Sequence, residues 1–294
     1  MTSSDATFKT LSTSPAAFVS LTDEDFQLFR SFFYHVSGIQ YSNAQRYYVD
    51  KRLIARLKVT GESSVSAYLN ELKSDPLGEE MNELIHLMTV KQTYFFREKY
   101  QFECLVHSIL PEYVNTRSGD KAIRIWSIPS SSGDEPYSIA IYLKEFWREL
   151  ARYGVEITGS DLDERILEVA RQGQYAKPAL QALPENLLRK YFTERPYGGY
   201  EVNKEIKALV KFSTANIHQT DLTQKFHDFD VIFCRNLLIY FDDASRKKAI
   251  HKLFNALKPG GFLCLGHSES LSRIESEFEI RRFEEALVYQ KPKP

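Results

Sequence analysis

One loop, residues 125–137, combines small residues with carboxylates in an order that suits ligand binding. An apolar run from Ile125 gives way to serines and Gly133, and Glu135 and Pro136 then open an amphipathic helix. Small side chains let the backbone approach a ligand, and proline at a first helical position already has the φ that a helix needs. A carboxylate accepts from hydroxyls and repels phosphate, so Glu135 suits a ribose or a cation. The loop fits a nucleoside cofactor, although an ordinary strand-to-helix turn explains it equally well.

A second carboxylate ends the next predicted strand. Residues 155–161 form a short apolar strand that finishes at Asp161, and a helix follows from Asp163. A strand, a loop, a helix and an acid at the tip of the next strand make the half-Rossmann unit that holds a ribose. We expect Asp161 to accept from the ribose hydroxyls and Asp163 to cap the helix, although either acid could serve as the cap.

A third strand, within residues 228–241, runs into Arg235 and Asn236 and then an aromatic pair that begins with Tyr240. Ligands in open α/β sheets bind outside the carboxyl ends of the strands. We therefore expect these three side chains to face the same crevice as Asp161.

The elements that must position these residues fall into two parts. After residue 121, strands alternate with helices, which indicates a doubly wound α/β sheet. Before residue 115 the chain reads as helical, and Pro111 should kink or restart the last helix. Within that helix an apolar stripe at helical spacing indicates core packing. The predicted helices are 22–36, 42–58, 64–73, 79–88 and one through the stripe Phe102, Leu105, Val106, Ile109 and Tyr113; further on we expect a helix over 243–257, a turn over 258–261, a strand over 262–266 and an antiparallel hairpin of 278–282 with 286–290.

The alternation lapses between residues 175 and 214. Prolines and the pair Gly198-Gly199 punctuate one short helix, 184–191, and strand-like pieces at 200–203 and 209–213. Several aromatic residues supply apolar surface that a solvated linker would lack, so a folded subdomain is the preferred interpretation.

Composition bounds the class of protein. The chain has 294 residues, 43% of them hydrophobic, and a net charge of −1, so it can hold one large and one small domain and shows no global field of a nucleic-acid protein. No run approaches the length of a membrane span, and the first residues lack the apolar core of a signal peptide. Three cysteines far apart in apolar contexts predict buried, reduced thiols in a cytosolic protein, and the histidines show no ligand spacing with them, so we expect no metal site.

Five motifs in a fixed order resemble the CheR family of chemotaxis receptor methyltransferases, which are S-adenosylmethionine-dependent enzymes that esterify receptor glutamates. The likeness covers nearly the whole chain after its first twenty residues. The motifs are Thr93-Tyr-Phe-Phe-Arg97, Ser132-Gly-Asp-Glu-Pro-Tyr-Ser138, Ser160-Asp-Leu-Asp163 with Ala170-Arg171, Phe233-Cys-Arg-Asn236 with Ile239-Tyr-Phe241, and Leu257-Lys-Pro-Gly260 with Gly266-His-Ser-Glu269.

The resemblance implies a fold and a function. It implies an α/β, Rossmann-like class I methyltransferase sheet with an N-terminal all-α domain and a small inserted antiparallel β-subdomain. The expected divisions are a disordered lead over 1–20, a helical domain over 21–115 and a methyltransferase domain over 116–294, with the insertion at about 176–213. The implied protein is a cytoplasmic protein-glutamate O-methyltransferase, a monomer that acts on the cytoplasmic helical region of methyl-accepting chemotaxis receptors, with neither nucleic acid nor membrane insertion.

The resemblance also assigns residues. It places Arg97 and Tyr240 beside the transferred methyl group as the catalytic pair. From the residues alone, a surface salt bridge of Arg97 and core packing of Tyr240 are the simpler interpretations. The expected contacts to S-adenosylmethionine, or to its product S-adenosylhomocysteine, come from Thr93, Glu135, Asp161, Asn216, Ile217, Arg235 and Asn236. Glu135 could take the methionine ammonium or a hydroxyl, and Arg235 could orient the methionine carboxylate or the substrate.

Two departures from the family pattern and two alternative functions stay open. Lys91 stands where the family usually has asparagine, which puts cofactor contact there in doubt, and Asp134 stands where glutamate is common. One alternative is a non-catalytic module that binds the cofactor and regulates a partner. The other is a methyltransferase of another macromolecule, for which the basic helix over residues 46–58 could supply a docking face.

Overall fold

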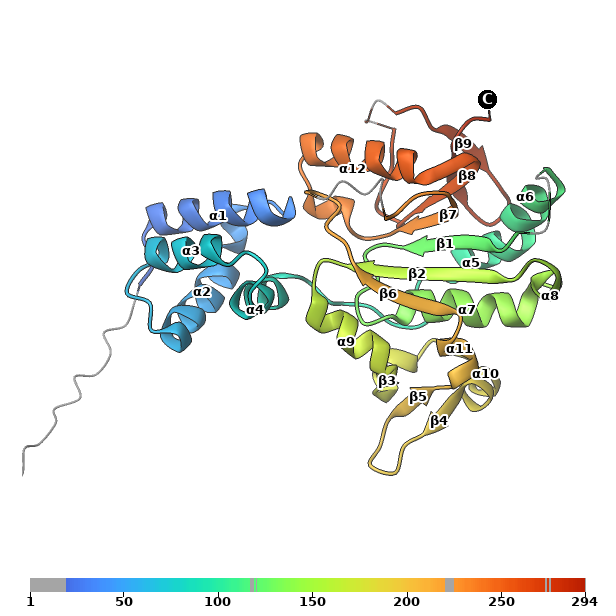
Figure 1. Cartoon of the computed structure of the whole chain (residues 1–294), viewed down its shortest axis with the longest axis horizontal. Coiled ribbons are helices and arrows are strands. Elements are labelled where there is room, and N and C mark those ends of the chain that lie inside the picture. Colours follow the sequence, from blue (N-terminus) through green and yellow to red (C-terminus); the bar gives the residue numbers. More distant parts are fainter. Residues whose placement is uncertain are drawn as a thin grey trace, which may run out of the picture.

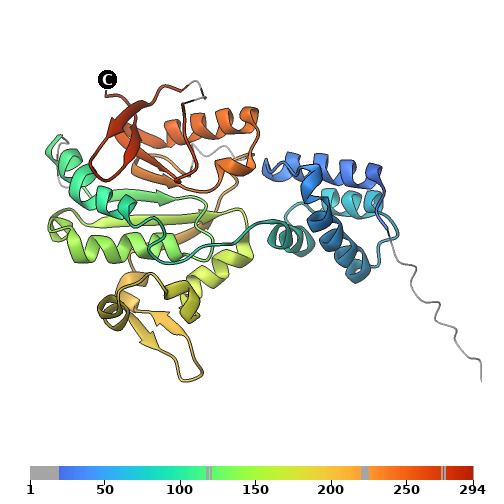
Figure 2. The ribbon, with the colours of Figure 1, turned by 180° about the vertical axis from the view of Figure 1, so that it is seen from behind.

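The computed structural model describes residues 20–293 except 117, 118, 120, 220–224, 273 and 275. A group of helices projects from one end of a larger α/β body, and the chain crosses from one part to the other after α4, which spans Glu79–Met88 (Figures 1 and 2). The expected disordered lead, 1–20, lies outside the described residues apart from its last position. Within the described residues, no helix is both long and apolar enough to cross a membrane.

The projecting part consists of α1 (Asp23–Ser37), the short 3₁₀ helix η1 (Asn43–Gln45), α2 (Arg46–Thr60), α3 (Val65–Ser74) and α4 (Glu79–Met88). Thr22 caps α1 in a capping box with Asp25, which satisfies two backbone N–H groups at the helix start. Ser42 and Gln45 form a capping box that opens η1 ahead of α2. Apolar faces of these helices enclose a separate core that includes Phe29, Phe33 and Leu53.

The larger part is built on a seven-stranded sheet in the order β6-β2-β1-β7-β8-β10-β9. The strands are β1 (Ile123–Ser127), β2 (Val155–Asp161), β6 (Val210–Thr214), β7 (Phe229–Cys234), β8 (Leu257–Leu265), β9 (Glu279–Arg282) and β10 (Leu287–Gln290). The first five strands in this order run parallel, and β10 and β9 form the predicted antiparallel hairpin. The chain leaves β1 toward β2 on one side and returns to β7 on the other. The crevice at this switch point lies outside the carboxyl ends of β1, β2 and β7.

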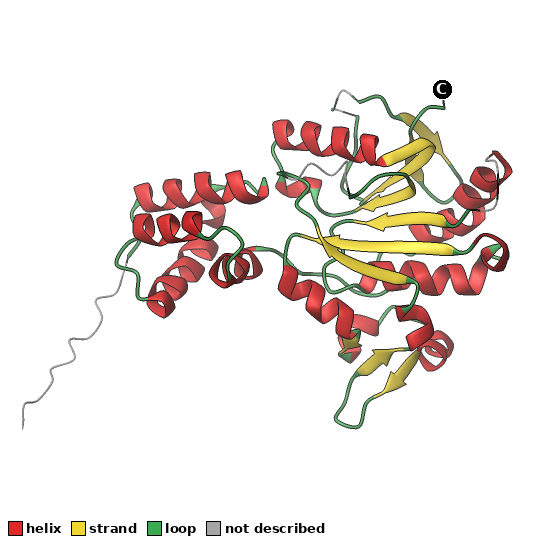
Figure 3. Ribbon diagram, viewed as in Figure 1, coloured by secondary structure: helices red, strands yellow, loops and turns green. Residues whose placement is uncertain are grey.

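Helices cover both faces of the sheet (Figure 3). The helix α7 (Asp134–Phe146) and the helical segment over residues 100–116 pack on one face, and α12 (Asp243–Ala256) packs on the other. The remaining helices beside the sheet are α8 (Leu150–Tyr153) and α9 (Glu164–Gln172). α7 begins at Asp134, so Pro136 occupies its third position and not its first.

The predicted long helix before the sheet is divided into α5 (Tyr100–Cys104), the π-helical η2 (Leu105–Ile109) and α6 (Leu110–Thr116). The wider π turn comes directly before Pro111, whose ring would crowd the carbonyl of a regular preceding turn. The apolar stripe predicted as core is buried, as expected, but it packs against the sheet in the same core as Ile123 and Phe262. The helical unit with its own core therefore ends at Met88, whereas the sequence predicts a helical domain that ends at residue 115.

The expected β-subdomain corresponds to a three-stranded antiparallel sheet in the order β3-β5-β4. It contains β3 (Gln174–Tyr175), η3 (Lys177–Leu180), α10 (Glu185–Tyr191), β4 (Phe192–Glu194), β5 (Tyr200–Val202) and α11 (Lys204–Lys207). The predicted strand at 209–213 appears as β6, which pairs with β2 at the edge of the large sheet. The structure thus differs from the predicted insertion, 176–213, at its end, because an apolar pattern cannot specify which sheet a strand joins.

The predicted turn at 258–261 is incorporated into β8, which runs continuously from Leu257. An irregularity in its pairing with β7 falls between Phe229 and Val231. Gly260 has a φ of +79°, which accommodates the bend within the strand.

Candidate cofactor and active site

Two adjoining cavities open over the carboxyl ends of β1, β2 and β7. They share Val90, Pro129, Ser131, Asn236 and Tyr240 in their walls. All nine residues predicted for the site line one cavity or both: Thr93, Arg97, Glu135, Arg235, Asn236 and Tyr240 line the first, and Asp161, Asn216, Ile217, Asn236 and Tyr240 line the second. The strand tips therefore converge as the sheet topology predicts.

Arg235 organises the floor of the first cavity. Its side chain is nearly buried, and its guanidinium donates to Glu135 Oε2 at 2.7 Å and to the backbone carbonyl of Arg97 at 2.7 Å. It also lies 3.2 Å from Glu98 Oε2. The Nε atom of Arg235 is buried without a partner in the described structure. The contact to the Arg97 carbonyl ties the segment that carries one predicted catalytic residue to the end of β7.

Glu135 stands between two donors. Ser127 Oγ donates to its Oε1 at 2.7 Å, and Arg235 holds its Oε2. Burial raises the pKa of Glu135, and the nearby Arg235 charge opposes that shift. Each carboxylate oxygen has a second lone-pair direction. Glu135 can therefore still accept from an ammonium or a hydroxyl, the two contacts considered from the sequence.

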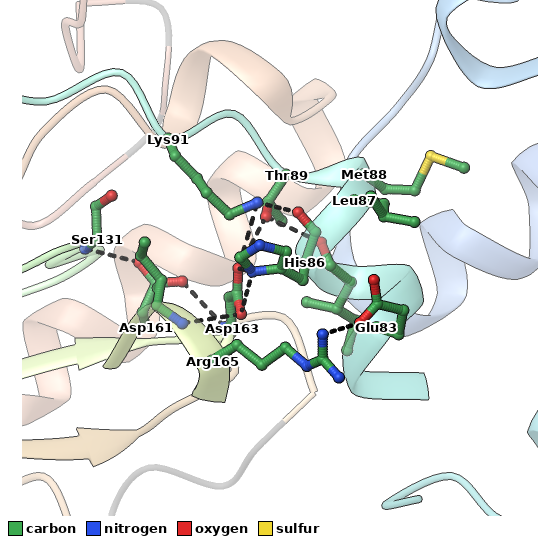
Figure 4. Close-up of polar contacts among 12 residues, drawn as sticks. Glu83, His86, Leu87, Met88, Thr89, Lys91, Ser131, Asp161, Asp163 and Arg165 are labelled. Atoms are coloured by element: carbon green, nitrogen blue, oxygen red, sulfur yellow. Dashed lines mark hydrogen bonds and ion pairs between the residues drawn. The ribbon is translucent and has the colours of Figure 1, made fainter. Parts of the chain in front are cut away.

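Asp161 presents a buried carboxylate to the second cavity (Figure 4). The backbone N–H of Ser131 donates to its Oδ2 at 2.9 Å and the N–H of Asp163 donates to its Oδ1 at 3.0 Å. Burial raises the pKa of Asp161 to about 6, while these N–H groups oppose the shift. Asp163, in contrast, accepts from the N–H of Ile166 at 3.2 Å and caps α9, so the predicted cap is confirmed.

Lys91 lies at the joint between the two parts of the chain and is absent from the lining of both cavities. Its ammonium donates to the carbonyl of His86 and lies 3.5 Å from Asp163 Oδ2, while His86 Nδ1 lies 2.9 Å from the same oxygen (Figure 4). Burial lowers the pKa of Lys91, and the Asp163 carboxylate opposes this. The residue that departs from the family pattern therefore links α4 to the start of α9.

Asn216 and Ile217 line the second cavity, but the amide of Asn216 is already engaged. Its Nδ2 donates to the carbonyl of Val36 at 2.7 Å, and its Oδ1 accepts from the N–H of His218 at 3.0 Å. Asn216 thus holds the end of α1 against the α/β body. Any contact from its side-chain amide to a ligand would compete with this role.

The helical part contributes wall residues that sequence reasoning missed. Ser37 and Ile39, from the end of α1, and Thr89 and Val90, after α4, line the second cavity. Ile39 forms an isolated antiparallel bridge with Phe241, and the N–H of Gln40 donates to the carbonyl of Tyr240 at 3.1 Å. These contacts join segments about two hundred residues apart, and no local pattern signals them.

Arg97 and Tyr240 line the first cavity from two different segments, one before α5 and the other after β7. Arg97 donates to the carbonyl of Gln92 at 2.8 Å, and the adjacent Glu98 pairs with Arg235. Glu103, also nearby in sequence, pairs with Lys99 at 2.8 Å. Burial raises the pKa of Tyr240, with the charge of Arg97 opposing, so the phenol is neutral at pH 7 and can donate a hydrogen bond.

Two of the basic side chains of α2, Arg46 and Arg56, form ion pairs with carboxylates of their own domain. Arg56 forms an ion pair with Glu80, Arg46 pairs with Asp50 at 3.2 Å, and Arg52 donates to the carbonyl of Leu87 at 2.9 Å. These contacts weaken the case for α2 as an uncompensated positive face.

The three cysteines have the buried environment that the sequence predicts. Cys104, Cys234 and Cys264 are buried free thiols, as predicted. Within the part of the chain that the structure describes, no group of three or more His, Cys, Asp or Glu side chains could hold a metal ion.

Comparisons with known proteins agree with this geometry. Residues 91–287 match the CheR methyltransferase, SAM binding domain, and residues 24–89 match the CheR methyltransferase, all-alpha domain, so the two matches meet at the end of α4. The chain is 45% identical over 274 residues to chemotaxis protein methyltransferase 2 of Vibrio cholerae, covering 93% of this chain and 95% of that protein. It is 31% identical to chemotaxis protein methyltransferase 1 of Pseudomonas aeruginosa, over 92% of this chain and 99% of the relative, and 34% identical to the chemotaxis protein methyltransferase of Escherichia coli, over 90% of each.

Proposed function

The chain belongs to the CheR methyltransferase family, and from that premise we propose that it methylates glutamate side chains in the cytoplasmic helical region of chemotaxis receptors. The observation that carries this proposal is the convergence of Asp161, Arg97 and Tyr240 on two adjoining cavities at the switch point of the sheet. We further propose that the protein acts in the cytoplasm, because the receptor region that it would modify lies there, and that it acts as a monomer.

The residues of the site fit S-adenosylmethionine, the cofactor of the matched domain. Asp161 offers a buried carboxylate for ribose hydroxyls, and Glu135 offers one for the methionine ammonium. The Nε of Arg235 and the Oγ of Ser131 are buried without a partner in the described structure, and both residues line the first cavity. An unpaired buried donor favours a ligand that satisfies it, so Arg235 suits the methionine carboxylate. When bound, the cofactor supplies a methyl group made electrophilic by its positively charged sulfur.

A glutamate acceptor places modest chemical demands on the protein. At pH 7 the carboxylate is already ionised, so the site needs no general base. Its task is to hold the carboxylate oxygen in line and to exclude water, and orientation of this kind supplies roughly 7–11 kcal/mol of a barrier. The negative charge of the acceptor disappears during the transfer, so a tight cationic grip on it would oppose the reaction.

Arg97 and Tyr240 match that requirement. Arg97 is half-buried at the cavity edge, where its planar guanidinium can orient a carboxylate without burying it in a full ion pair. The neutral phenol of Tyr240 can donate one hydrogen bond to the acceptor or hold the reacting groups in place. Both roles depend on placement by other residues: Arg235 holds the Arg97 backbone, and the N–H of Gln40 donates to the Tyr240 carbonyl.

The test of this proposal is methyl transfer with a chemical signature of the ester. The protein is incubated with S-adenosylmethionine carrying a labelled methyl group and with membranes rich in receptors, and the product is treated with alkali. A glutamyl methyl ester releases labelled methanol, whereas N-methyl or S-methyl products keep the label. Label that stays on the receptor would refute glutamate esterification, and tight binding of S-adenosylhomocysteine without any transfer would support the non-catalytic alternative.

A further inference from the structure

Glu269, in the last family motif, has no role in the site described above, yet its carboxylate collects four backbone donors. Its Oε2 accepts from the N–H of Asn236 at 2.7 Å and from that of Gly266 at 2.9 Å. Its Oε1 accepts from the N–H of Leu238 at 2.7 Å and from that of Ile239 at 3.3 Å. One half-buried side chain therefore fixes both the end of β8 and the loop that follows β7.

The loop from Asn236 to Tyr240 needs such support. Asn236 has a φ of +59°, in the left-handed region, and the loop then closes into the short 3₁₀ helix η4 (Leu238–Tyr240). Its own backbone contributes the hydrogen bonds from Tyr240 N to Leu237 O at 3.1 Å and from Phe241 N to Leu238 O at 3.2 Å. The donors of three residues at the start of the loop go to Glu269 instead. Hydrogen bonds to a charged acceptor are among the stronger ones in proteins.

Gly266 gives independent evidence that this contact is built closely. A Cβ atom at position 266 would lie 2.8 Å from Glu269 Oε2 and 3.0 Å from the backbone nitrogen of Asn236. Such distances force a shift of the carboxylate or of the loop. The glycine therefore leaves room for the carboxylate between the end of β8 and the loop after β7.

The same loop carries two residues that line both cavities, Asn236 and Tyr240. A displacement of the backbone at residues 236–239 would move the Tyr240 hydroxyl, whereas Asp161 and Glu135 come from other elements and would stay in place. A misplacement of about 1 Å can cost on the order of 100-fold in rate. The position of this loop should therefore affect transfer more than cofactor binding.

We infer that Glu269 is a positioning residue for methyl transfer: it anchors the loop after β7 so that Tyr240 meets the acceptor carboxylate. The inference rests on the proposed function, in which Tyr240 contacts the acceptor. In Glu269→Gln, one amide oxygen remains as an acceptor, but the NH₂ group must face N–H donors of the loop or of Gly266. The substitution keeps the shape of the side chain and replaces two of the four hydrogen bonds by contacts between two donors.

The experiment compares the variants Glu269→Gln, Gly266→Ala, Tyr240→Phe and the double variant Glu269→Gln/Tyr240→Phe in the full chain. Glu279→Gln, the same chemical change on the exposed edge strand β9, is the matched control. We expect Glu269→Gln and Gly266→Ala to lower kcat at least tenfold while the Kd for S-adenosylhomocysteine changes by less than threefold. In the Tyr240→Phe background, the fold-decrease in kcat caused by Glu269→Gln should be less than a third of the fold-decrease that it causes in the wild-type background. The reason is that the hydroxyl that Glu269 positions is absent from this background.

Three outcomes decide between the explanations. A wild-type kcat for Glu269→Gln overturns the inference. So does a double variant in which Glu269→Gln lowers kcat by the same factor as it does in the wild-type background. A fall in the melting temperature and in the amount of folded protein with unchanged kcat per folded molecule also overturns it, because Glu269 would then serve stability alone. If Tyr240→Phe itself transfers methyl at the wild-type rate, the proposed role of Tyr240 fails. Should Glu269→Gln not fold, Gly266→Ala tests the same contact by the same kcat and Kd criteria.

Discussion

Replacing Asp161 by asparagine tests the cofactor site with the smallest change in shape. In the native protein both carboxylate oxygens accept backbone N–H groups, from Ser131 and from Asp163. An asparagine can supply an oxygen to only one of them, and its NH₂ group then faces the other donor. The variant also loses the negative charge that makes a carboxylate a strong acceptor for two ribose hydroxyls.

The expected loss follows from the kind of hydrogen bond that disappears. Hydrogen bonds to charged groups contribute about 1.5–3 kcal/mol each, so the Kd for S-adenosylhomocysteine should rise roughly 10- to 150-fold at pH 7.5. The effect should fall mainly on binding, because Asp161 lies on β2, whereas Arg97 and Tyr240 come from other segments of the chain. Isothermal titration calorimetry measures the Kd, and circular dichroism establishes that the variant is folded.

The pH dependence of this loss gives a sharper test. Burial raises the pKa of Asp161 to about 6 in the free protein, so the carboxyl becomes protonated as the pH falls below that value. A protonated carboxyl resembles an asparagine amide, and the ratio of the variant Kd to the wild-type Kd should shrink toward one between pH 7.5 and pH 5. Glu135 titrates in both proteins, and its effect therefore cancels in the ratio.

Two results would refute this reasoning. Asp161→Asn could bind S-adenosylhomocysteine with wild-type affinity at pH 7.5, which would remove Asp161 from the cofactor site. Alternatively, the affinity of the variant could be lower by the same factor at every pH from 5 to 7.5, which would mean that protonation of Asp161 does not control cofactor binding in this range.

Further predictions concern catalysis, stability and the domain joint. Arg97→Ala should lower methyl transfer at least tenfold with little change in the Kd for S-adenosylhomocysteine, and Arg97→Lys should rescue poorly because an ammonium lacks the planar fork; wild-type transfer by the lysine variant would contradict the orienting role. Burial raises the pKa of Asp134 from 3.8 to about 6, so the stability linked to this group is complete below pH 4 and is lost as the pH rises through 6. Asp134→Asn should therefore raise the unfolding free energy by about 1–3 kcal/mol at pH 8 and not at pH 4, as measured by denaturant titration. Lys91→Asn should speed hydrogen exchange over residues 86–94 but change the Kd for S-adenosylhomocysteine less than threefold, because Lys91 binds His86 and Asp163 outside the cavities. Arg56→Glu should destabilise the helical part by breaking its ion pair with Glu80, whereas the same reversal at exposed Lys51 should not; equal melting temperatures would show that the ion pair contributes nothing.

Sequence patterns predicted which side chains lie together where the topology of the sheet alone brings them to one edge. Asp161 ends β2, Arg235 and Tyr240 follow β7, and the carboxyl ends of parallel strands meet at one edge of the sheet. The cap at Asp163 was also predictable, because capping is a local interaction between a side chain and the next helical turn.

Contacts between residues far apart in the chain could not be predicted from the sequence. The stripe through Phe102 has the same spacing whether it packs within a helical domain or against a sheet, so the boundary of the helical unit was placed too late. The spacing of apolar residues also could not predict that β6 pairs with β2 in the large sheet. The engagement of Asn216 with Val36 and of Glu269 with the loop after β7 depends on partners far away in the chain. The residue types indicated that these side chains could form hydrogen bonds, but they did not identify the partners.

The most direct test of the central claim is to locate the transferred methyl group. A purified cytoplasmic receptor fragment is incubated with the protein and with S-adenosylmethionine carrying a deuterated methyl group, and tandem mass spectrometry of its peptides follows. The proposed function predicts label on glutamate side chains, lost on mild alkali treatment and at least tenfold reduced with Arg97→Ala. Label on lysine, cysteine or a backbone terminus, or no label from a folded protein that binds S-adenosylhomocysteine, would contradict it.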